Sequence, residues 1–235
     1  MKKSIMMVMA LVICVALIAS PAFAKTKFQL GIKAGLGLAN AAEKDTAGNS
    51  PVDPYKPKMK MGLDAGVFFR IIPSEQICIQ PEILYTMKGY KLNDFTTEGD
   101  TVTNYKWNAN FIEIPVLVKY LIPTQGNFKP NIFVGPYLGI LASLKEKATV
   151  NGTDSTVDRK DSTVKKIDFG AVFGVGFDYK VGTSGVLTFD ARYELGLTNL
   201  EKNPIGSSKS KASNIAFMIG YAFDMGKHEA TEPKK

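Results

Sequence analysis

The sequence predicts an all-β protein: an eight-stranded antiparallel up-and-down transmembrane β-barrel, preceded by a cleaved signal peptide. Three observations support this fold class. The first residues resemble a secretion signal, eight later segments alternate apolar with small or polar residues, and the connections between those segments are alternately long and short. Alternation with a period of two is typical of β-strands, because successive side chains point to opposite faces of a sheet.

Residues 1–24 have the composition of a signal peptide. Lys2 and Lys3 precede an apolar segment from Ile5 to Ile18, and Ala22-Phe23-Ala24 is a typical cleavage site. The alternative is a membrane anchor, but the apolar run is short for a span, and Pro21 with the Ala-Phe-Ala site favours cleavage.

Cleavage would divide the chain into three parts. The signal peptide covers residues 1–24, the barrel covers residues 25–225, and a polar tail without any strand pattern covers residues 226–235. We expect this tail to be disordered. The mature chain would contain one cysteine, Cys78, which excludes an internal disulfide.

The charge distribution excludes some classes of partner and site. The net charge of +7 falls to +5 without Lys2 and Lys3, and the remaining excess is spread along the chain. A nucleic-acid interface would instead concentrate its basic residues on one patch. The one histidine, His228, lies in the polar tail, which weighs against histidine-based catalysis and a histidine-rich metal site.

Eight strands are expected from the alternating pattern. They cover residues 28–39, 59–72, 76–92, 105–121, 131–144, 166–180, 186–198 and 213–224. Polar loops are expected at 41–58, 93–104, 145–165 and 199–212, and shorter turns at 73–75, 122–130 and 181–185. Long loops at one end and short turns at the other are typical of outer-membrane barrels, and an even number of strands places both termini on the short-turn, periplasmic side.

The last strand shows which face carries which residues. Ile215, Phe217, Ile219, Tyr221 and Phe223 share one face, and the opposite face is small or polar. In a soluble barrel the apolar face would fill the interior, but eight strands enclose a space too narrow for so many aromatic residues. We therefore expect the apolar faces to contact lipid and the glycines to make room inside for charged side chains.

The charged residues opposite the apolar ones form a predicted lumen network. Both signs occur in similar numbers, so the charges can be paired, as buried charges must be. The network comprises Lys33, Asp64, Arg70, Glu82, Lys88, Glu113, Lys119, Asp168, Asp190, Arg192 and Glu194. Within it, a group formed by Glu82, Glu113, Lys119, Arg192 and Glu194 is the preferred core.

This network has two interpretations, a structural plug and a conduction path. The plug is favoured, because the interior of an eight-stranded barrel is normally filled by side chains. A catalytic carboxylate pair formed by Glu82 and Glu113 is a further alternative. Ion pairing across the lumen is a simpler explanation of these two glutamates.

Aromatic residues are expected to form two girdles at the membrane interfaces. One would lie near the short turns, with Phe28, Tyr120, Tyr179, Tyr221 and Phe223. The other would lie near the long loops, with Tyr85, Tyr90, Tyr105, Trp107 and Tyr193.

The ordered segments GIKAGLGLAN, GLDAGVFFRI, QPEILYTMKG, FIEIPVLVKY, IFVGPYLGIL, DFGAVFGVGFDY, FDARYELGLTNL and IAFMIGYAF resemble the PorT-like outer-membrane β-barrel family of Bacteroidetes-type bacteria, often labelled "porin family". The resemblance covers nearly the whole mature chain. It implies an eight-stranded barrel in the outer membrane of a Gram-negative cell, and it transfers no catalytic residue.

The expected function is that of a small outer-membrane barrel with a structural or loop-mediated interaction role. One alternative is a narrow-pore porin for small solutes, and another is an outer-membrane enzyme that modifies lipid. We expect no enzymatic activity and no catalytic, cofactor-binding or metal-binding residues. The expected partners are outer-membrane lipid, lipopolysaccharide as a further candidate, the barrel-assembly machinery during biogenesis, and a protein still to be identified; nucleic acid is not expected.

The longest expected loop raises two smaller questions. Its basic residues are candidates for contact with lipopolysaccharide phosphates, with a merely solvated loop as the alternative. They are Lys145, Lys147, Arg159, Lys160, Lys165 and Lys166. In the same loop, Asn151-Gly152-Thr153 matches an N-glycosylation sequon, which we interpret as a chance loop sequence.

Overall fold

The computed structural model describes residues 26–44, 58–92, 94–97, 99–158, 165–183, 185–199 and 209–225. The predicted signal peptide and polar tail lie outside these residues. The described part contains eight long strands: β1 (Lys27–Lys44), β2 (Lys58–Ile72), β3 (Ile77–Lys91), β5 (Asp100–Leu121), β6 (Phe128–Val150), β8 (Ile167–Val181), β9 (Gly185–Gly196) and β10 (Lys209–Asp224). Two short strands complete it, β4 (Phe95–Thr97) and β7 (Thr153–Asp158). None of the described residues belongs to a helix that could cross a membrane.

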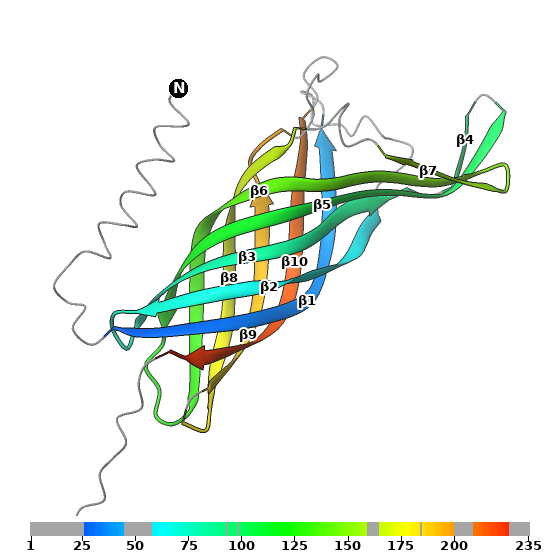
Figure 1. The fold of residues 1–235 in the computed structure, drawn as a ribbon. Helices are drawn as coiled ribbons and strands as arrows, with labels where there is room; N and C mark the ends of the chain where they lie inside the picture. Colours follow the sequence, from blue (N-terminus) through cyan, green and yellow to red (C-terminus); the bar gives the residue numbers. More distant parts are fainter. Residues whose placement is uncertain are drawn as a thin grey trace, which may run out of the picture.

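The eight long strands pair in a closed ring. Each is antiparallel to its neighbours in the chain, and β1 also pairs with β10, where Leu36 lies opposite Phe217. Figure 1 shows these strands side by side, with β1 next to β10. Each of the eight expected strands overlaps one strand of the ring. Closure gives each of these strands a partner on both sides, which removes the unpaired edges that an open sheet would expose.

The short connections lie at one end of the ring. Residues 73–76, 122–127 and 182–184 separate β2 from β3, β5 from β6, and β8 from β9. The beginning and the end of the described chain meet at the same end, where the Met225 amide donates to the Phe28 carbonyl at 2.9 Å. We call this the short-turn end and the opposite one the long-loop end.

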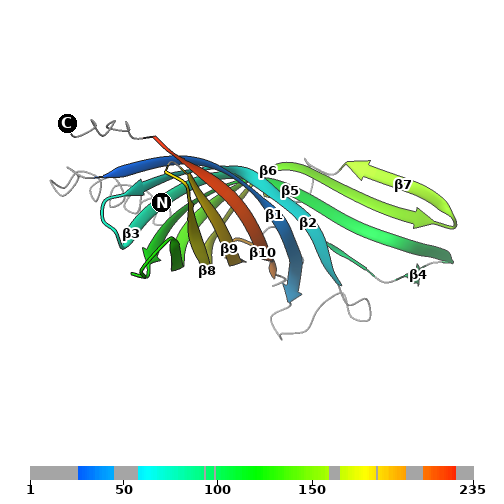
Figure 2. The ribbon, with the colours of Figure 1, turned by 90° about the horizontal axis from the view of Figure 1, so that it is seen from below.

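Two of the expected loops are in fact largely β-structure. Residues 93–104 contain β4 and the start of β5, and residues 145–165 contain the end of β6 and β7. These segments pair in the order β4-β5-β6-β7, which we call the extension sheet. Figure 2 shows it projecting beyond the ring at the long-loop end.

The extension sheet depends on a turn that the sequence interpretation missed. Asn151 and Gly152 have φ angles of 47° and 81° between β6 and β7. A hairpin with positive φ at both central residues is a type I′ turn, for which Asn-Gly is a preferred sequence. The Asn-Gly dipeptide that we interpreted as a chance loop sequence is therefore the signal of this hairpin.

The two faces of the ring have the polarity expected for a lipid-facing protein. Outside, Phe217 and Val175 are each 58% exposed, whereas inside, Arg192 is 2% exposed. We call the exposed outer set the apolar band; it includes Leu30, Ile32, Leu36, Met61, Leu63, Val67, Ile83, Tyr85, Ile112, Val118, Ile132, Val134, Ile140, Phe173, Val175, Tyr193, Phe217 and Ile219. Because a water-soluble protein rarely exposes so continuous an apolar surface, this face requires an apolar environment.

Candidate functional site: the charged interior

The interior of the ring buries every member of the predicted lumen network. Lys33, Asp64, Arg70, Glu82, Lys88, Glu113, Lys119, Asp168, Asp190, Arg192 and Glu194 are each no more than 4% exposed. They occupy alternate positions of their ring strands, so strand periodicity alone directs them inward. Their contacts divide them into three layers along the axis of the ring.

The central layer contains three cations and two carboxylates. Lys33 Nζ lies 2.7 Å from Glu82 Oε1 and 2.7 Å from Asp190 Oδ2. Arg192 donates to Glu82 Oε2 at 2.8 Å and to Asp190 Oδ2 at 3.0 Å, and Lys119 Nζ lies 3.0 Å from Asp190 Oδ1. Each carboxylate therefore binds at least two cations, which compensates for its removal from water.

The long-loop layer, next toward the long-loop end, is rich in carboxylates. Lys88 forms ion pairs with Glu113 and Glu194. The Asn214 amide donates to Asp64 at 3.0 Å and to Glu194 at 3.2 Å. In the same layer, the Tyr137 hydroxyl donates to Asp168 at 2.8 Å. Neutral donors thus bind carboxylates that Lys88 alone could not pair.

The short-turn layer includes a partner that the sequence interpretation omitted. Arg70 forms an ion pair with Asp178, and its Nε lies 3.4 Å from the Sγ of the buried Cys78. Asp178 is 4% exposed and also accepts a bond from Asn131. The alternation of β8 already placed Asp178 on the inner face, so the signal for it was present in the sequence.

The structure does not bring the expected core group together. Glu82, Lys119 and Arg192 belong to the central layer, whereas Glu113 and Glu194 bind Lys88 in the long-loop layer. Glu82 and Glu113 therefore bind different cations and do not form a carboxylate pair. Among the described residues, no group of three or more His, Cys, Asp or Glu side chains could hold a metal ion.

Inner glycines accommodate aromatic rings, and the rings in turn lie beneath cations. A Cβ atom on Gly31 would lie 2.3 Å from the Phe68 ring, and one on Gly174 would lie 2.2 Å from the Phe133 ring. The ammonium of Lys33 lies 4.8 Å from the centroid of the Phe68 ring, and that of Lys119 lies 4.9 Å from the Phe133 centroid.

The same arrangement recurs with Gly170, Tyr137 and Lys88, where the ammonium lies 4.8 Å from the ring centroid. Cation–π contacts of this kind are strongest in desolvated surroundings. We had expected glycine to make room for charged side chains; at these three positions the room is taken by aromatic rings that cover the charges.

An apolar cluster lies in the interior between the long-loop layer and the long-loop end of the ring. It is formed by Ala109, Phe111, Leu141, Leu144 and Ala212, and Trp107 packs against it. The Trp107 ring stacks on Tyr90 with a centroid distance of 5.5 Å, and Tyr90 lies 6.4 Å from Tyr105. This corrects part of the expected long-loop girdle, because Trp107 packs against the interior cluster and not against lipid.

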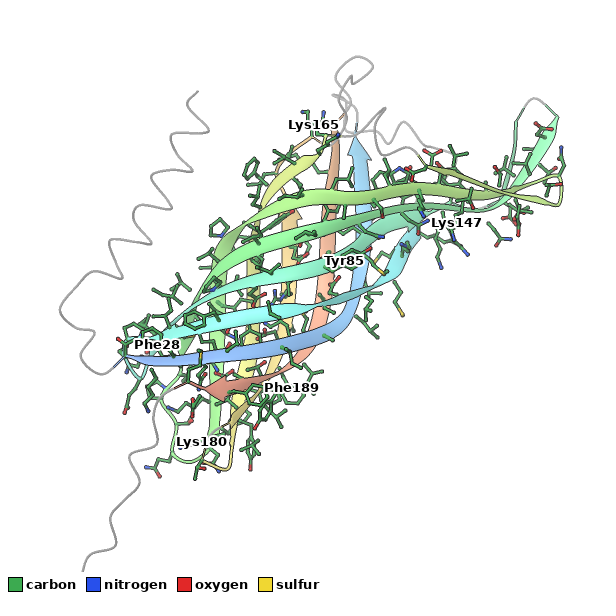
Figure 3. All side chains as sticks on the ribbon, viewed as in Figure 1. Phe28, Tyr85, Lys147, Lys165, Lys180 and Phe189 are labelled. Atoms are coloured by element: carbon green, nitrogen blue, oxygen red, sulfur yellow. The ribbon has the colours of Figure 1, made fainter. Side chains whose placement is uncertain are left out.

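Other aromatic residues lie outside, near the ends of the strands. Phe28, Tyr120, Tyr179 and Phe223 are exposed near the short turns, and Tyr85 and Tyr193 are exposed further toward the long loops. Figure 3 shows Phe28 at the short-turn end of the ribbon.

A cavity of about 510 Å³ lies at the short-turn end of the ring, next to the short-turn layer. Charged residues of both signs line it, including Lys27, Glu75, Lys129, Lys180 and Asp224. Arg70 and Asp178 also contribute to its lining, so the cavity ends at a buried ion pair.

The basic residues proposed for the longest loop are not gathered in one place by the structure. Lys145 and Lys147 belong to β6, and Lys165 and Lys166 precede β8. Figure 3 shows Lys147 on the extension sheet and Lys165 near the start of β8. Arg159 and Lys160 lie outside the described residues.

Several solved outer-membrane proteins are similar to this chain at low sequence identity. OprG from Pseudomonas aeruginosa is 14% identical with a TM-score of 0.49, and the match covers 85% of this chain and 96% of OprG. A major outer membrane protein from Thermus thermophilus is 12% identical with a TM-score of 0.49, covering 86% of this chain and all of that one. Neisserial surface protein A is 15% identical with a TM-score of 0.40, covering 82% and 95%.

A search of curated proteins found no match. The model of one protein family, described as outer membrane protein beta-barrel domain, matches residues 20–202, which is most of the chain. The chain therefore belongs to the outer membrane protein beta-barrel domain family, and this membership implies a location in the outer membrane.

Proposed function

We propose that this protein is an eight-stranded transmembrane barrel with a sealed, charge-filled lumen and a structural or interaction role at the cell surface. In this proposal a signal peptide is cleaved during export, both termini are periplasmic, and the extension sheet presents the interacting surface. The observation that carries the proposal is the inverted polarity of the ring, which exposes the apolar band and buries the charge network.

The sealed lumen rests on the central layer and the apolar cluster. Glu82 and Arg192 are joined across the ring, and the side chains of the central layer are no more than 1% exposed. The cluster around Phe111 and Leu144 adds a second, apolar obstruction nearer the long-loop end. A solute would have to displace paired charges and packed apolar groups to pass both.

The proposed orientation rests on the asymmetry of the connections. The start of β1, the end of β10 and the short turns all lie at the short-turn end of the ring. The extension sheet lies at the opposite, long-loop end. In outer-membrane barrels the short turns are periplasmic and the longer connections extracellular. The extension sheet would therefore project into the surroundings of the cell.

The proposed partners follow from this placement. Outer-membrane lipid would surround the apolar band, the barrel-assembly machinery would insert the chain, and a protein partner would contact the extension sheet. Within the outer membrane protein beta-barrel family, we propose that this protein is PorT-like. We assign no catalytic role to the interior carboxylates, because each contacts a cation or a neutral donor.

Conductance in planar lipid bilayers tests the sealed lumen. We expect no steady current from the folded full-length protein under conditions in which an open porin conducts. The combined variant Glu82→Ala/Arg192→Ala removes one charge of each sign and should raise the conductance. Steady conductance of the unmodified protein at the level of the porin standard would favour the narrow-pore alternative.

Surface accessibility tests the orientation. An epitope inserted between Asn151 and Gly152 should be accessible to antibody on intact cells, whereas an epitope after Lys235 should become accessible only after the outer membrane is opened. The reverse result would overturn the proposed placement of the termini.

A lipid A profile unchanged by deletion of the protein is the result expected for a protein without lipid-modifying activity.

A further inference from the structure

Four lysines form a continuous row across neighbouring strands at the long-loop end. Lys58 on β2 is the register partner of Lys91 on β3, Lys91 is the partner of Lys106 on β5, and Lys106 is the partner of Lys147 on β6. Neighbouring strands are about 4.8 Å apart, so the row spans roughly 15 Å. Like charges directly opposite each other destabilise a sheet, so a bound anion would stabilise this arrangement.

The lysine row lies on the outer surface. Tyr90 and Trp107 are also register partners, next to Lys91 and Lys106, and Trp107 packs against the interior cluster. Because successive side chains alternate, Lys91 and Lys106 point to the opposite, outer face. Lys58, Lys91 and Lys147 are exposed, and Lys106 is partly exposed.

A fifth lysine adds to the same positive field. Lys60 on β2 lies between the exposed residues Met59 and Met61. Its side chain reaches β3, because a Cβ atom on Gly89 would lie 3.3 Å from the Cδ of Lys60. Within the described residues, none of the four lysines of the row has an acidic register partner; Lys147 on its other side lies opposite Thr156.

The row borders the apolar band. On β5 the outward positions change from Ile112 to polar residues and then to Lys106, and on β6 they change from Ile140 to Lys147. A molecule bound here would meet apolar side chains on one side of the row and water on the other. That combination matches a lipid, whose acyl chains would contact the band while its headgroup reaches the lysines.

We propose that the lysine row of Lys58, Lys91, Lys106 and Lys147 binds the headgroup of a lipid that carries more than one phosphate. Several ammonium groups within about 15 Å suit several phosphates better than a single one, because each lysine acts as a separate point charge. The inference rests on the proposed orientation, which places this end of the ring at the outer leaflet. Only Lys147 is shared with the basic loop residues expected from the sequence.

Binding to lipopolysaccharide, a lipid with several phosphates, tests the proposal. The folded full-length protein in neutral detergent would be titrated with lipopolysaccharide, with enzymatically dephosphorylated lipopolysaccharide, and with phosphatidylglycerol. Fluorescence of Trp107, the chain's only tryptophan and the neighbour of Lys106, would report binding. Intact lipopolysaccharide should bind at least tenfold more tightly than either of the other two lipids.

A matched pair of variants locates the site. Lys58→Gln/Lys91→Gln/Lys147→Gln should weaken lipopolysaccharide binding at least tenfold, whereas Lys27→Gln/Lys129→Gln/Lys180→Gln, which removes three lysines around the short-turn cavity, should leave binding unchanged. Equal affinity of the row variant and the unmodified protein, or equal binding of the dephosphorylated lipid, would overturn the inference. Either result would leave the barrel proposal intact. Folding is tested separately by comparing migration on SDS gels before and after boiling, which should differ for a folded membrane barrel, and sealing is tested by the conductance measurement.

Discussion

Arg192 on β9 donates to Glu82 on β3 at 2.8 Å, although 110 residues separate the two in the chain. In the ring order β3-β2-β1-β10-β9, the two strands are four positions apart in a ring of eight, so they face each other across its full width. This ion pair therefore ties opposite walls of the ring together. It also places a carboxylate and a guanidinium in the path that a solute would have to take.

Loss of the Glu82 charge should strongly destabilise the protein. Glu82→Gln preserves the size of the side chain but leaves Lys33 and Arg192 with Asp190 as their only carboxylate in the central layer. Breaking a buried pair by removing one partner costs about 3–5 kcal/mol. The free energy of unfolding in lipid vesicles, measured with urea, should fall by about that amount. Glu75→Gln in the exposed turn after β2 is the control, and an equal effect of both variants would contradict a special role of the central layer.

Gly174 should tolerate no side chain while Phe133 lies over it. Gly174→Ala places a methyl group 2.2 Å from the Phe133 ring and 2.7 Å from the Ala191 carbonyl oxygen, and we expect a loss of about 1–3 kcal/mol in unfolding free energy. Gly139→Ala is the control, because its nearest neighbour would be 3.4 Å away.

A second substitution separates the ring contact from the backbone contact. In a Phe133→Leu background, Gly174→Ala should lower the free energy of unfolding by less than it does in the unmodified protein, with a difference of about 0.5 kcal/mol or more. Identical costs in the two backgrounds would show that the Phe133 ring is not what excludes the methyl group.

A charge introduced into the apolar band should lower the free energy of unfolding, and more so the deeper the residue lies in the membrane. Val175 is 58% exposed near the middle of β8, so Val175→Arg would place a guanidinium among lipid tails. The expected loss is about 2–4 kcal/mol, as for arginine near the midplane of a barrel. Val157→Arg on the exposed strand β7 should change the unfolding free energy little. Comparable losses for both variants would argue against a lipid-embedded ring.

The Asn151-Gly152 turn should control the extension sheet without affecting the ring. Gly152 has a φ of 81°, a conformation that costs a residue with a Cβ about 1–2 kcal/mol. Gly152→Ala should therefore accelerate hydrogen exchange in β7 and at the end of β6, while exchange in β1 and β10 stays the same. Faster exchange throughout the ring would show that the hairpin is coupled to global stability.

Strand periodicity was a sufficient guide to which charged side chains of the lumen network lie inside, although it did not place Trp107 there. Lys33 and Arg192 alternate with apolar neighbours in short segments of sequence, and a strand carries that alternation directly into its two faces. The grouping of the charges was not predictable in the same way. Glu113 and Glu82 belong to the same set by periodicity, yet they bind different cations, because their heights in the ring depend on the register of every intervening strand pair.

By itself, the sequence determined the all-β class, the eight ring strands, the short turns and the inward direction of the charged side chains of the lumen network, because these follow from local alternation and turn residues. Only the tertiary structure decided that Arg192 meets Glu82, that Asp178 completes the pair with Arg70, that Trp107 covers the interior, and that lysines from four strands form one row. The physical reason is that a contact across a ring or along a row depends on closure and register, which residues far apart in the chain establish together.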